Sequence, residues 1–270
     1  RSGVPLKEID EVIIGNVAQP AHAANISRVI ALKAGLDNHI PAYTVHRNCA
    51  SGMESITSAA LKLRQGEASI IAAGGTESMS NIPLLYGKKM TSFFEKLSRS
   101  RSLGAKLSTL LKFRLHFLKP VIGVMQGLTD PVSGLIMGLT AENLAREFHI
   151  TRLQQDEFAL KSHQKAVTAQ KNGIFSEEII PVPLPKDFTQ VMEHDEGPRE
   201  NQTMEALGKL RPYFDRKNGT VTVGNACPIT DGAAAVILTT EEKAREMGVK
   251  PLGFLSGYAY AGLEIGRAHV

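Results

Sequence analysis

The sequence predicts an α/β fold in which helices cover a largely parallel sheet, with a largely helical insertion in the middle of the chain. Three observations carry this prediction. Short apolar runs alternate with helical patterns over residues 1–79, the alternation stops at Pro83, and it returns from Gly219. Such alternation with short links favours a parallel sheet packed between helices. With 270 residues and 43% hydrophobic side chains, the chain can bury one large core or two modest ones.

The expected strands are short runs rich in apolar and β-branched residues. They cover residues 11–17, 42–47, 68–73, 219–224 and 232–240. The expected helices have apolar residues at helical spacing, and most of them stop at a glycine. They cover residues 24–34, 52–65, 140–148, 151–172 and 241–247. Thr151 and Gln154 are spaced as a capping box. We therefore expect a core over residues 1–79 and 219–263 and a loop domain over residues 80–218.

Composition excludes several classes of protein. Two cysteines, Cys49 and Cys227, argue against a disulfide framework and for a reducing compartment, and the eight histidines show no metal-binding spacing. No run reaches the roughly 18 apolar residues that a membrane-spanning helix needs. Arg1–Asp10 is not followed by the apolar segment of a signal peptide. Because the chain lacks a starting Met, we expect it to begin inside a longer one.

The net charge of +4 is concentrated in one segment. Residues 88–119 contain nine basic residues and one acid, Glu95, so this segment carries +8 and the rest of the chain −4. The basic residues therefore belong to one insertion and do not form a nucleic-acid-binding surface over the fold. We expect no nucleic-acid partner.

Cys49 is the strongest candidate for a catalytic residue. A β-prone stretch ends just before it, residues 50–52 form a tight turn, and a helix begins at once. The positive end of a helix dipole favours thiolate over thiol, which makes the sulfur nucleophilic. From spacing alone, a small buried cysteine without a chemical role is the commoner interpretation.

Two further segments are candidates for ligand contact. Gly74-Gly75 follows an apolar strand, where α/β sheets bind substrates, although an ordinary glycine turn explains the pair more simply. Residues 219–235 place Asn225, Cys227 and Asp231 beside glycines. A ligand-facing loop and a plain strand–turn–strand unit explain that segment equally well.

Seven stretches together resemble the thiolase family, in the family's order and across nearly the whole chain. They are NCASG around Cys49, GGTESMS at 74–80, MGLTAENLA at 137–145, QDEFALKSHQKA at 155–166, DEGPR at 195–199, LRPYF at 210–214 and GTVTVGNACPITDGAAA at 219–235. The resemblance implies a layered α-β-α fold of two similar halves, with residues 1–263 as a partial N-terminal domain. It is strongest to the thiolase subunit of fatty-acid oxidation complexes.

The resemblance also implies a mechanism. Cys49 would attack the 3-keto carbon of a 3-ketoacyl-CoA, acetyl-CoA would leave, and free CoA would then take the acyl group. CoA is thus a substrate, and no cofactor is expected. The matching positions that imply contacts with CoA or the acyl chain are Leu128, Met137, Arg211, Asn225 and Cys227.

Two positions depart from the family pattern. The family commonly has Ser at the position of Cys227, and a thiol is a weaker hydrogen-bond partner than a hydroxyl. Many short-chain biosynthetic members have His where this chain has Ile136. An apolar residue there favours a roomier acyl pocket.

Part of the family's catalytic machinery is not encoded in these 270 residues. The histidine of a GHP motif, the second cysteine of a CxGGG motif and the asparagine of an NEAF motif do not occur. Because Claisen chemistry needs a base and an oxyanion hole besides the nucleophile, we predict that this chain alone does not turn over. Residues 264–270 (EIGRAHV) match the translation of a common sequencing adapter and are interpreted as an artefactual tail.

The insertion is predicted to contain an amphipathic helix over residues 103–118. Its leucines and phenylalanines fall on one side, with Lys112, His116 and Lys119 opposite. That pattern is typical of a helix on an anionic membrane, and a cap helix packed on the loop domain is the alternative. The resemblance favours the membrane, because a similar insertion occurs in membrane-bound oxidation complexes. It also implies a hydratase/dehydrogenase partner subunit.

The leading hypothesis is a degradative 3-ketoacyl-CoA thiolase of fatty-acid β-oxidation. A biosynthetic acetoacetyl-CoA thiolase is the enzymatic alternative, and an acyl-CoA-binding or assembly module without chemistry is the third. The resemblance implies a homodimer or tetramer. It also implies a location in the bacterial cytoplasm, or in mitochondria if the source is eukaryotic, with peripheral membrane contact through residues 88–119.

Overall fold

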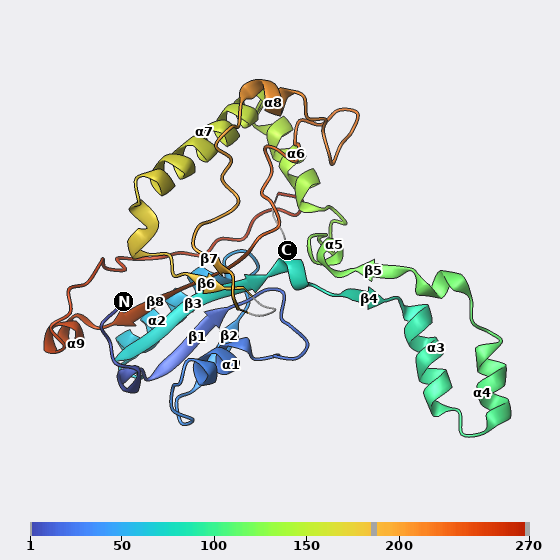
Figure 1. Ribbon diagram of the computed structural model, residues 1–270, viewed down its shortest axis with the longest axis horizontal. Helices are drawn as coiled ribbons and strands as arrows, with labels where there is room; N and C mark the ends of the chain where they lie inside the picture. The colour runs from blue at the N-terminus through green and yellow to red at the C-terminus, as the bar shows by residue number, and fades with distance from the viewer. Residues whose placement is uncertain (1, 185–187, 268–270) are drawn as a thin grey trace. The chain divides into compact units, whose positions relative to one another are not determined.

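The protein is described by a computed structural model that covers residues 2–184 and 188–267 (Figure 1). The chain forms two compact units. The first runs to Leu128 and resumes over Ile229–Gly262, and the second comprises Thr129–Pro228 with the residues after Gly262. The division into a core over residues 1–79 and 219–263 and a loop domain over residues 80–218 stays a prediction. Residues 268–270 of the predicted tail lie outside the described residues.

The first unit contains a four-stranded sheet with the strand order β2-β1-β3-β8. The strands are β1 (Glu11–Gly15), β2 (Ala42–Val45), β3 (Ile70–Ser78) and β8 (Asp231–Thr239). β1 pairs in parallel with both β2 and β3, which confirms the predicted α/β arrangement. β8 pairs antiparallel with β3 over the full length of both strands. The sheet is therefore parallel except at β8.

β3 is longer than the sequence predicts. The expected turn at Gly74-Gly75 is wrong, because the strand continues through both glycines to Ser78 and only then enters the short 3-10 turn η2 (Met79–Asn81). A Cβ atom at Gly74 would overlap the carbonyl oxygen of Ala234 on β8. Glycine is thus needed for the close approach of two paired strands and not for a change of direction.

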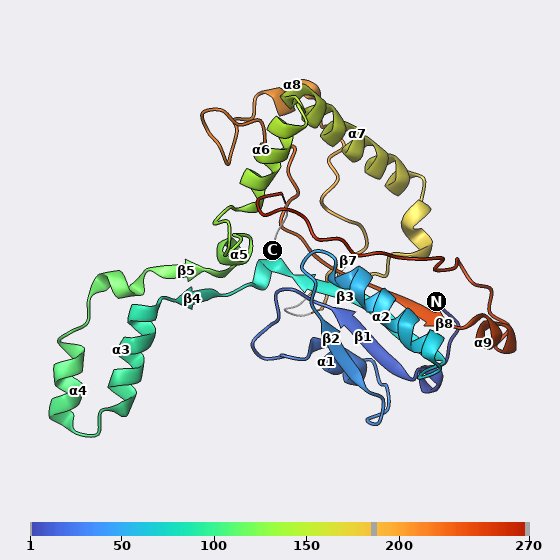
Figure 2. The same ribbon diagram turned by 180° about the vertical axis from the view of Figure 1, so that it is seen from behind.

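Helices cover both faces of the sheet. The helices are α1 (Ile26–Lys33) on one face and α2 (Ser51–Gln65) on the other. The short helix η1 (Leu6–Glu8) precedes β1, and α9 (Glu241–Glu246) follows β8. Val12 and Ile14 of β1 pack with Ala31 of α1, whereas Ile13 between them packs with Ala59 of α2. Figure 2 shows α2 lying across its face of the sheet. Ile13 is fully buried, and burying such a side chain stabilises the fold by about 1.5–3 kcal/mol.

The basic insertion forms a hairpin of short helices. It comprises α3 (Lys88–Arg99), α4 (Leu103–Leu110) and η3 (Leu115–Leu118). β4 (Leu84–Tyr86) precedes it, and β5 (Pro120–Ile122) and α5 (Gly123–Gly127) follow it. The predicted single helix over residues 103–118 is wrong, because α4 ends at Leu110 and a turn leads into the separate 3-10 helix η3. Phe113 and Phe117 then pack on Phe93 of α3, with ring centroids 5.3 and 6.2 Å apart. The aromatic side chains thus hold the hairpin together.

The second unit is mainly helical. Its elements are α6 (Met137–Glu147), α7 (Arg152–Lys171), η4 (Ile174–Glu177), β6 (Val182–Pro183), β7 (Val191–Met192) and α8 (Met204–Gly208). The capping box of Thr151 and Gln154 at the start of α7 is confirmed. No helix in the described parts of the chain is both long and apolar enough to cross a membrane.

The strand predicted over residues 219–224 is wrong. The backbone N–H groups of Thr220 and Val221 donate to the carboxylate of Glu142 on α6, at 2.9 and 2.8 Å. Glu142 is only 1% exposed, so this buried carboxylate takes the donors that a strand would offer to a neighbouring strand.

Candidate active site

Cys49 lies in the turn that joins β2 to α2. β2 ends at Val45, and Ala50 is the cap residue of α2, so the cysteine immediately precedes the helix cap. The thiol is exposed and free. The predicted place at a helix start is therefore confirmed, and the alternative of a buried cysteine does not hold. Its chemical role stays a prediction at this point.

A buried hydroxyl group fixes the backbone on both sides of Cys49. The Ser51 hydroxyl accepts a hydrogen bond from the Arg47 N–H at 2.8 Å and donates one to the Asn48 carbonyl oxygen at 2.7 Å. Ser51 is 4% exposed. Asn48 has a positive φ of 44°, a conformation that asparagine adopts more readily than most residues. The turn is thus held in one conformation by local hydrogen bonds.

The first turn of α2 rests directly on two glycines of the sheet. A Cβ atom at Gly15 would overlap the Ser51 carbonyl group and lie 2.6 Å from the Gly52 nitrogen. A Cβ atom at Gly75 would lie 3.4 Å from the Gly52 Cα. Gly75 belongs to the pair that the sequence singles out, whereas Gly15 was missed. Its signal is only that it closes the apolar run EVIIG.

A pocket of about 370 Å³ lies beside Cys49 in the first unit. Its lining comes from the ends of β1 and β3, the Cys49 turn and the start of β8. The lining residues are Gly15, Val17, Asn48, Cys49, Ser51, Gly52, Gly75, Thr76, Glu77, Gly232, Ala233 and Ala234. The carboxyl ends of parallel strands are where open α/β sheets bind ligands. Most of the lining side chains are small, which leaves the sulfur accessible to a substrate.

Glu77 builds one wall of this pocket. Its carboxylate accepts hydrogen bonds from the N–H groups of Val17 and Ala18 at 2.9 and 2.8 Å and from the Asn16 side-chain amide at 2.9 Å. The carboxylate therefore ties the loop after β1 to the end of β3. Glu77 lies within the stretch GGTESMS, but no local pattern in that stretch indicates this role.

Asp231 begins β8 next to the lining residue Gly232 and pairs with Ser78 at the end of β3. It accepts hydrogen bonds from the hydroxyl and the N–H of Ser80, the latter at 2.9 Å. These bonds, the hydroxyl first, lower the pKa of the Asp231 carboxyl group. The polar end of the predicted segment 219–235 thus secures the strand ends at the pocket.

An ion pair spans the Cys49 turn from residue 47 to residue 54. Arg47 Nε lies 2.5 Å from Glu54 Oε2, and the Arg47 guanidinium lies over the ring of Tyr260, 4.2 Å from its centroid. The hydrogen bond from Arg47 lowers the pKa of Glu54, and the same bond raises the pKa of Arg47. Both groups are therefore charged at neutral pH.

The residues predicted to contact CoA lie at separate places along the chain. Leu128 follows α5 at the end of the first unit and is half-buried. Met137 begins α6 and is half-buried, whereas Arg211 and Cys227, also in the second unit, are exposed. Their contacts with CoA stay predictions.

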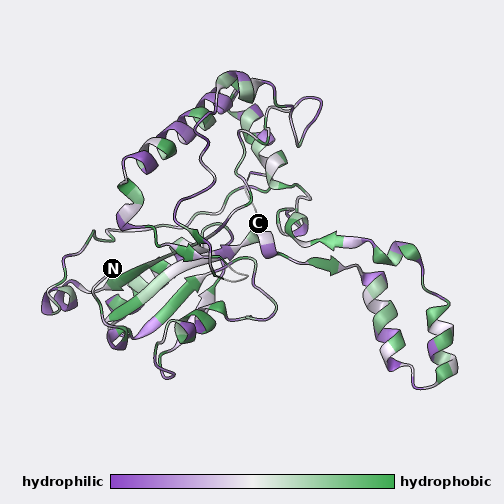
Figure 3. Ribbon diagram, in the orientation of Figure 1, coloured by the Kyte–Doolittle hydropathy of each residue, from purple (hydrophilic) through white to green (hydrophobic). Residues whose placement is uncertain are grey.

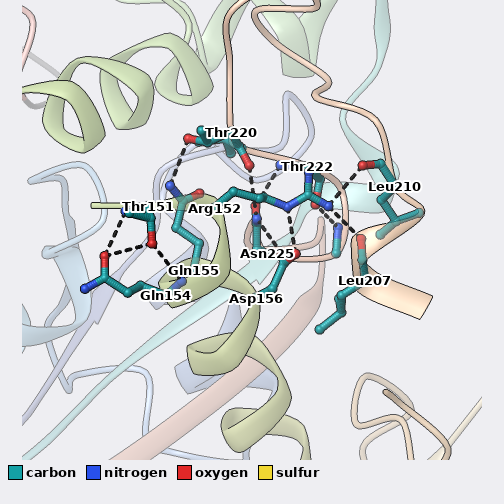
Figure 4. A network of polar contacts seen from close by, with 12 residues as sticks. Thr151, Arg152, Gln154, Gln155, Asp156, Leu207, Leu210, Thr220, Thr222 and Asn225 are labelled. Carbon is teal, nitrogen blue, oxygen red and sulfur yellow. Dashed lines mark hydrogen bonds and ion pairs between the residues drawn. The ribbon is translucent and has the colours of Figure 1, made fainter. Parts of the chain in front are cut away.

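Asn225 lies in a polar network of the second unit (Figure 4). Its amide nitrogen donates to Asp156 Oδ1 at 2.9 Å and to the Thr220 carbonyl oxygen at 3.2 Å, and its Oδ1 accepts from the Thr222 N–H at 2.7 Å. Both amide hydrogens are therefore used within the protein. The role of Asn225 toward CoA stays a prediction, limited to what Oδ1 can still accept.

Arg152 extends this network to α8. Its guanidinium pairs with Asp156 at 2.7 Å and donates to the carbonyl oxygens of Leu207 and Leu210 at 2.6 and 3.0 Å. The backbone immediately before Arg211 is thus anchored.

Among the described residues, no group of three or more His, Cys, Asp or Glu side chains is placed to hold a metal ion.

Comparison with known proteins gives a consistent set of relatives. The family described as "Thiolase, N-terminal domain" matches residues 1–242. A "Probable acetyl-CoA acyltransferase" of Staphylococcus aureus (strain COL) is 42% identical over 265 residues. A "3-ketoacyl-CoA thiolase" of Escherichia coli (strain SMS-3-5 / SECEC) is 39% identical over 265 residues. The two alignments cover 97% and 98% of this chain, but 62% and 60% of those proteins.

A solved structure shows the same fold. The crystal structure of the Bacillus anthracis acetyl-CoA acetyltransferase superposes with a TM-score of 0.84 and 36% sequence identity. The superposition covers 98% of this chain and 62% of that one. The chain therefore spans less than two thirds of the length of these relatives.

Proposed function

The chain belongs to the thiolase family, and from this premise we propose that Cys49 accepts the acyl group in an acyl-CoA acyltransferase. The observation that carries the proposal is the exposed Cys49 thiol at the start of α2, beside a pocket at the carboxyl ends of β1 and β3. The names of the relatives support this class of reaction. The reaction itself belongs to the whole protein.

In the proposed reaction, the Cys49 thiolate attacks the C3 carbonyl carbon of a 3-ketoacyl-CoA and forms a carbon–sulfur bond. The bond between C2 and C3 then breaks, and its electron pair leaves with C2 as the enolate of acetyl-CoA, which takes up a proton. The thiol of free CoA loses its proton and attacks the acyl-Cys49 thioester, which releases the shortened acyl-CoA and restores the cysteine. The dipole of α2 favours negative charge near Cys49 throughout.

The proposed direction is degradation of 3-ketoacyl-CoA in fatty-acid β-oxidation. Ile136, which caps α6 next to Met137, supports this choice because an apolar residue suits a longer acyl chain. Synthesis of acetoacetyl-CoA is the alternative. Rates of the full-length protein with 3-ketoacyl-CoA substrates of increasing length decide between them, since a biosynthetic enzyme loses activity beyond the four-carbon substrate.

Acylation of Cys49 tests the nucleophile directly. The purified 270-residue chain is incubated with acetyl-CoA, and peptides are analysed by mass spectrometry. We expect an acetyl thioester on Cys49, little on Cys227, which is also exposed, and none on a Cys49→Ser variant. Acylation of both cysteines at the same rate would contradict the proposal that Cys49 is the nucleophile. Continuous cleavage of a 3-ketoacyl-CoA by this chain would contradict the prediction that it does not turn over.

We also propose that the hairpin of residues 88–119 contacts an anionic membrane. The observation that favours this is a set of exposed leucines in the segment that also carries nine basic residues. Figure 3 shows hydrophobic and hydrophilic residues interspersed along α3 and α4. The exposed leucines are Leu103, Leu107, Leu110, Leu111, Leu115 and Leu118. Apolar side chains next to basic ones bind to anionic lipid surfaces.

Liposome sedimentation tests the membrane proposal. We expect the chain to sediment with vesicles that contain anionic lipid and not with neutral ones. Charge reversal at Lys106, Lys112 and Arg114 should abolish sedimentation, whereas reversal at Lys161 and Lys165 of α7 should not. Equal sedimentation of both variants would contradict the proposal.

Three further proposals concern the whole protein. It forms a homodimer or tetramer, it joins a hydratase/dehydrogenase subunit in an oxidation complex, and it works in the cytoplasm or in mitochondria. CoA is its substrate, and it uses no cofactor. Size measurement and co-purification of the full-length protein test the first two.

A further inference from the structure

Arg47 binds forward across the turn that carries Cys49. Its backbone N–H donates to the Ser51 hydroxyl at 2.8 Å, and its Nε donates to Glu54 Oε2 at 2.5 Å. Ser51 and Glu54 both belong to the first turn of α2. The segment from residue 47 to residue 54 is therefore closed twice, once through the backbone and once through a charged side-chain pair, with Cys49 between the two ends.

An exposed ion pair alone would hold this turn only weakly, and the Arg47 side chain is 49% exposed. Tyr260 strengthens the hold of Arg47 on the turn. Its ring covers the guanidinium at 4.2 Å from the centroid, and its hydroxyl lies 2.6 Å from Thr57 Oγ1, one helical turn after Glu54. Thr57 is 1% exposed, so Tyr260 is anchored on a rigid part of α2. A cation over an aromatic ring adds to the ion pair and restricts the rotamers of Arg47.

We propose that Arg47 is a positioning residue for Cys49, and that Tyr260 holds Arg47 in the orientation that does so. This inference rests on the proposed function, because a thiolate must approach the thioester carbon along a narrow range of directions. Arg47 does not touch the acyl group in this account. It keeps residues 48–50 from moving away from α2, and Tyr260 links this restraint to the segment that ends the first unit.

Five forms of the 270-residue chain test the inference: the unchanged chain, Arg47→Met, Arg47→Lys, Tyr260→Leu and Arg64→Met. Arg64→Met is the matched control, because Arg64 is an exposed arginine in the last turn of the same helix. Two rates are measured by peptide mass spectrometry: acylation of Cys49 by acetyl-CoA over a range of concentrations, and alkylation of Cys49 and Cys227 by iodoacetamide. Cys227 serves as the internal reference in every molecule.

We expect Arg47→Met to lower the maximal acylation rate of Cys49 by about 10- to 100-fold, as misplacement of a reacting group does. The half-saturating acetyl-CoA concentration and the alkylation of Cys227 should not change. Arg47→Lys should restore part of the rate, since an ammonium group can still reach Glu54 through one hydrogen bond. Tyr260→Leu should give an intermediate rate. Arg64→Met should behave as the unchanged chain.

The inference is overturned if Arg47→Met and Arg64→Met acylate within twofold of each other. If Arg47→Met does not fold, Tyr260→Leu decides, because Tyr260 is half exposed and its replacement leaves the core intact. A wrong proposed function would give a different result from a wrong role of Arg47. In that case the unchanged chain is not acylated, yet alkylation of Cys49 relative to Cys227 still depends on Arg47.

Discussion

The backbone of Gly15 lies so close to that of Ser51 that a Cβ atom at Gly15 would overlap the Ser51 carbonyl group. Gly15→Ala must therefore push the first turn of α2 away from the sheet. Overpacking of this kind costs about 1–3 kcal/mol, and we expect the free energy of unfolding in urea to fall by that amount. Gly52→Ala is the control, because a Cβ atom there meets nothing within 4 Å and alanine favours a helix. Equal stability of the two variants would contradict the close packing.

Loss of the Glu77 carboxylate should free the loop after β1. In Glu77→Gln, an NH2 group replaces one of the two carboxylate oxygens, so the N–H of either Val17 or Ala18 loses its acceptor. Hydrogen bonds to a charged acceptor contribute about 1.5–3 kcal/mol, so hydrogen exchange should rise at least about tenfold at the one of these two amides that loses its acceptor. Glu67→Gln, an exposed site after α2, should leave their exchange unchanged. Unchanged exchange in Glu77→Gln would show that Glu77 does not hold the loop after β1.

Glu142→Gln should destabilise the second unit. The Glu142 carboxylate accepts from the N–H groups of Thr220 and Val221 in a site that is 1% exposed. Replacing a charged acceptor by a neutral one there should lower the free energy of unfolding by about 1.5–3 kcal/mol. Glu157→Gln, an exposed change on α7, should have no effect. If both variants unfold at the same urea concentration, the carboxylate does not organise this loop.

The pair of Arg47 and Glu54 should make stability depend on acid pH. The hydrogen bond from Arg47 holds the pKa of Glu54 below its ordinary value of 4.5. Because the folded pKa is depressed, the pair contributes stability above the ordinary value and loses it as the pH falls through the folded pKa. The melting temperature of the unchanged chain should therefore exceed that of Glu54→Gln at neutral pH, and the difference should shrink below pH 4.5. A difference that stays constant in acid would rule out this linkage.

Local patterns predicted elements of both units. The apolar run before Gly15, the helix after Cys49 and the capping box at Thr151 each depend on neighbours close in sequence, and the structure has all three. The same locality explains why the helix-start position of Cys49 could be predicted without any partner being known.

Contacts between distant residues could not be predicted in the same way. The strand pattern at 219–224 is overridden by Glu142, which lies 78 positions before Thr220. The helix pattern at 103–118 is overridden by the packing of Phe113 and Phe117 on Phe93. In both places a tertiary contact outweighs a local preference that contributes only tenths of a kcal/mol for each residue. The hydrogen bonds of Glu77 to the loop after β1 and the contact of the Tyr260 ring with Arg47 could not be predicted for the same reason.

The antiparallel pairing of β3 with β8 sets an order on synthesis of the chain at the ribosome. The side chains of Ser78 and Asp231, which meet at one end of this pair, are 153 positions apart, and residues Thr129–Pro228 of the second unit are translated between them. β3 therefore emerges with one edge open, and it waits roughly 8 to 30 s at typical elongation rates of about 5–20 residues per second before its partner appears. An open apolar strand edge invites pairing with other chains. A nascent chain that pauses within the second unit is consequently exposed to aggregation until residues 231–239 leave the ribosome.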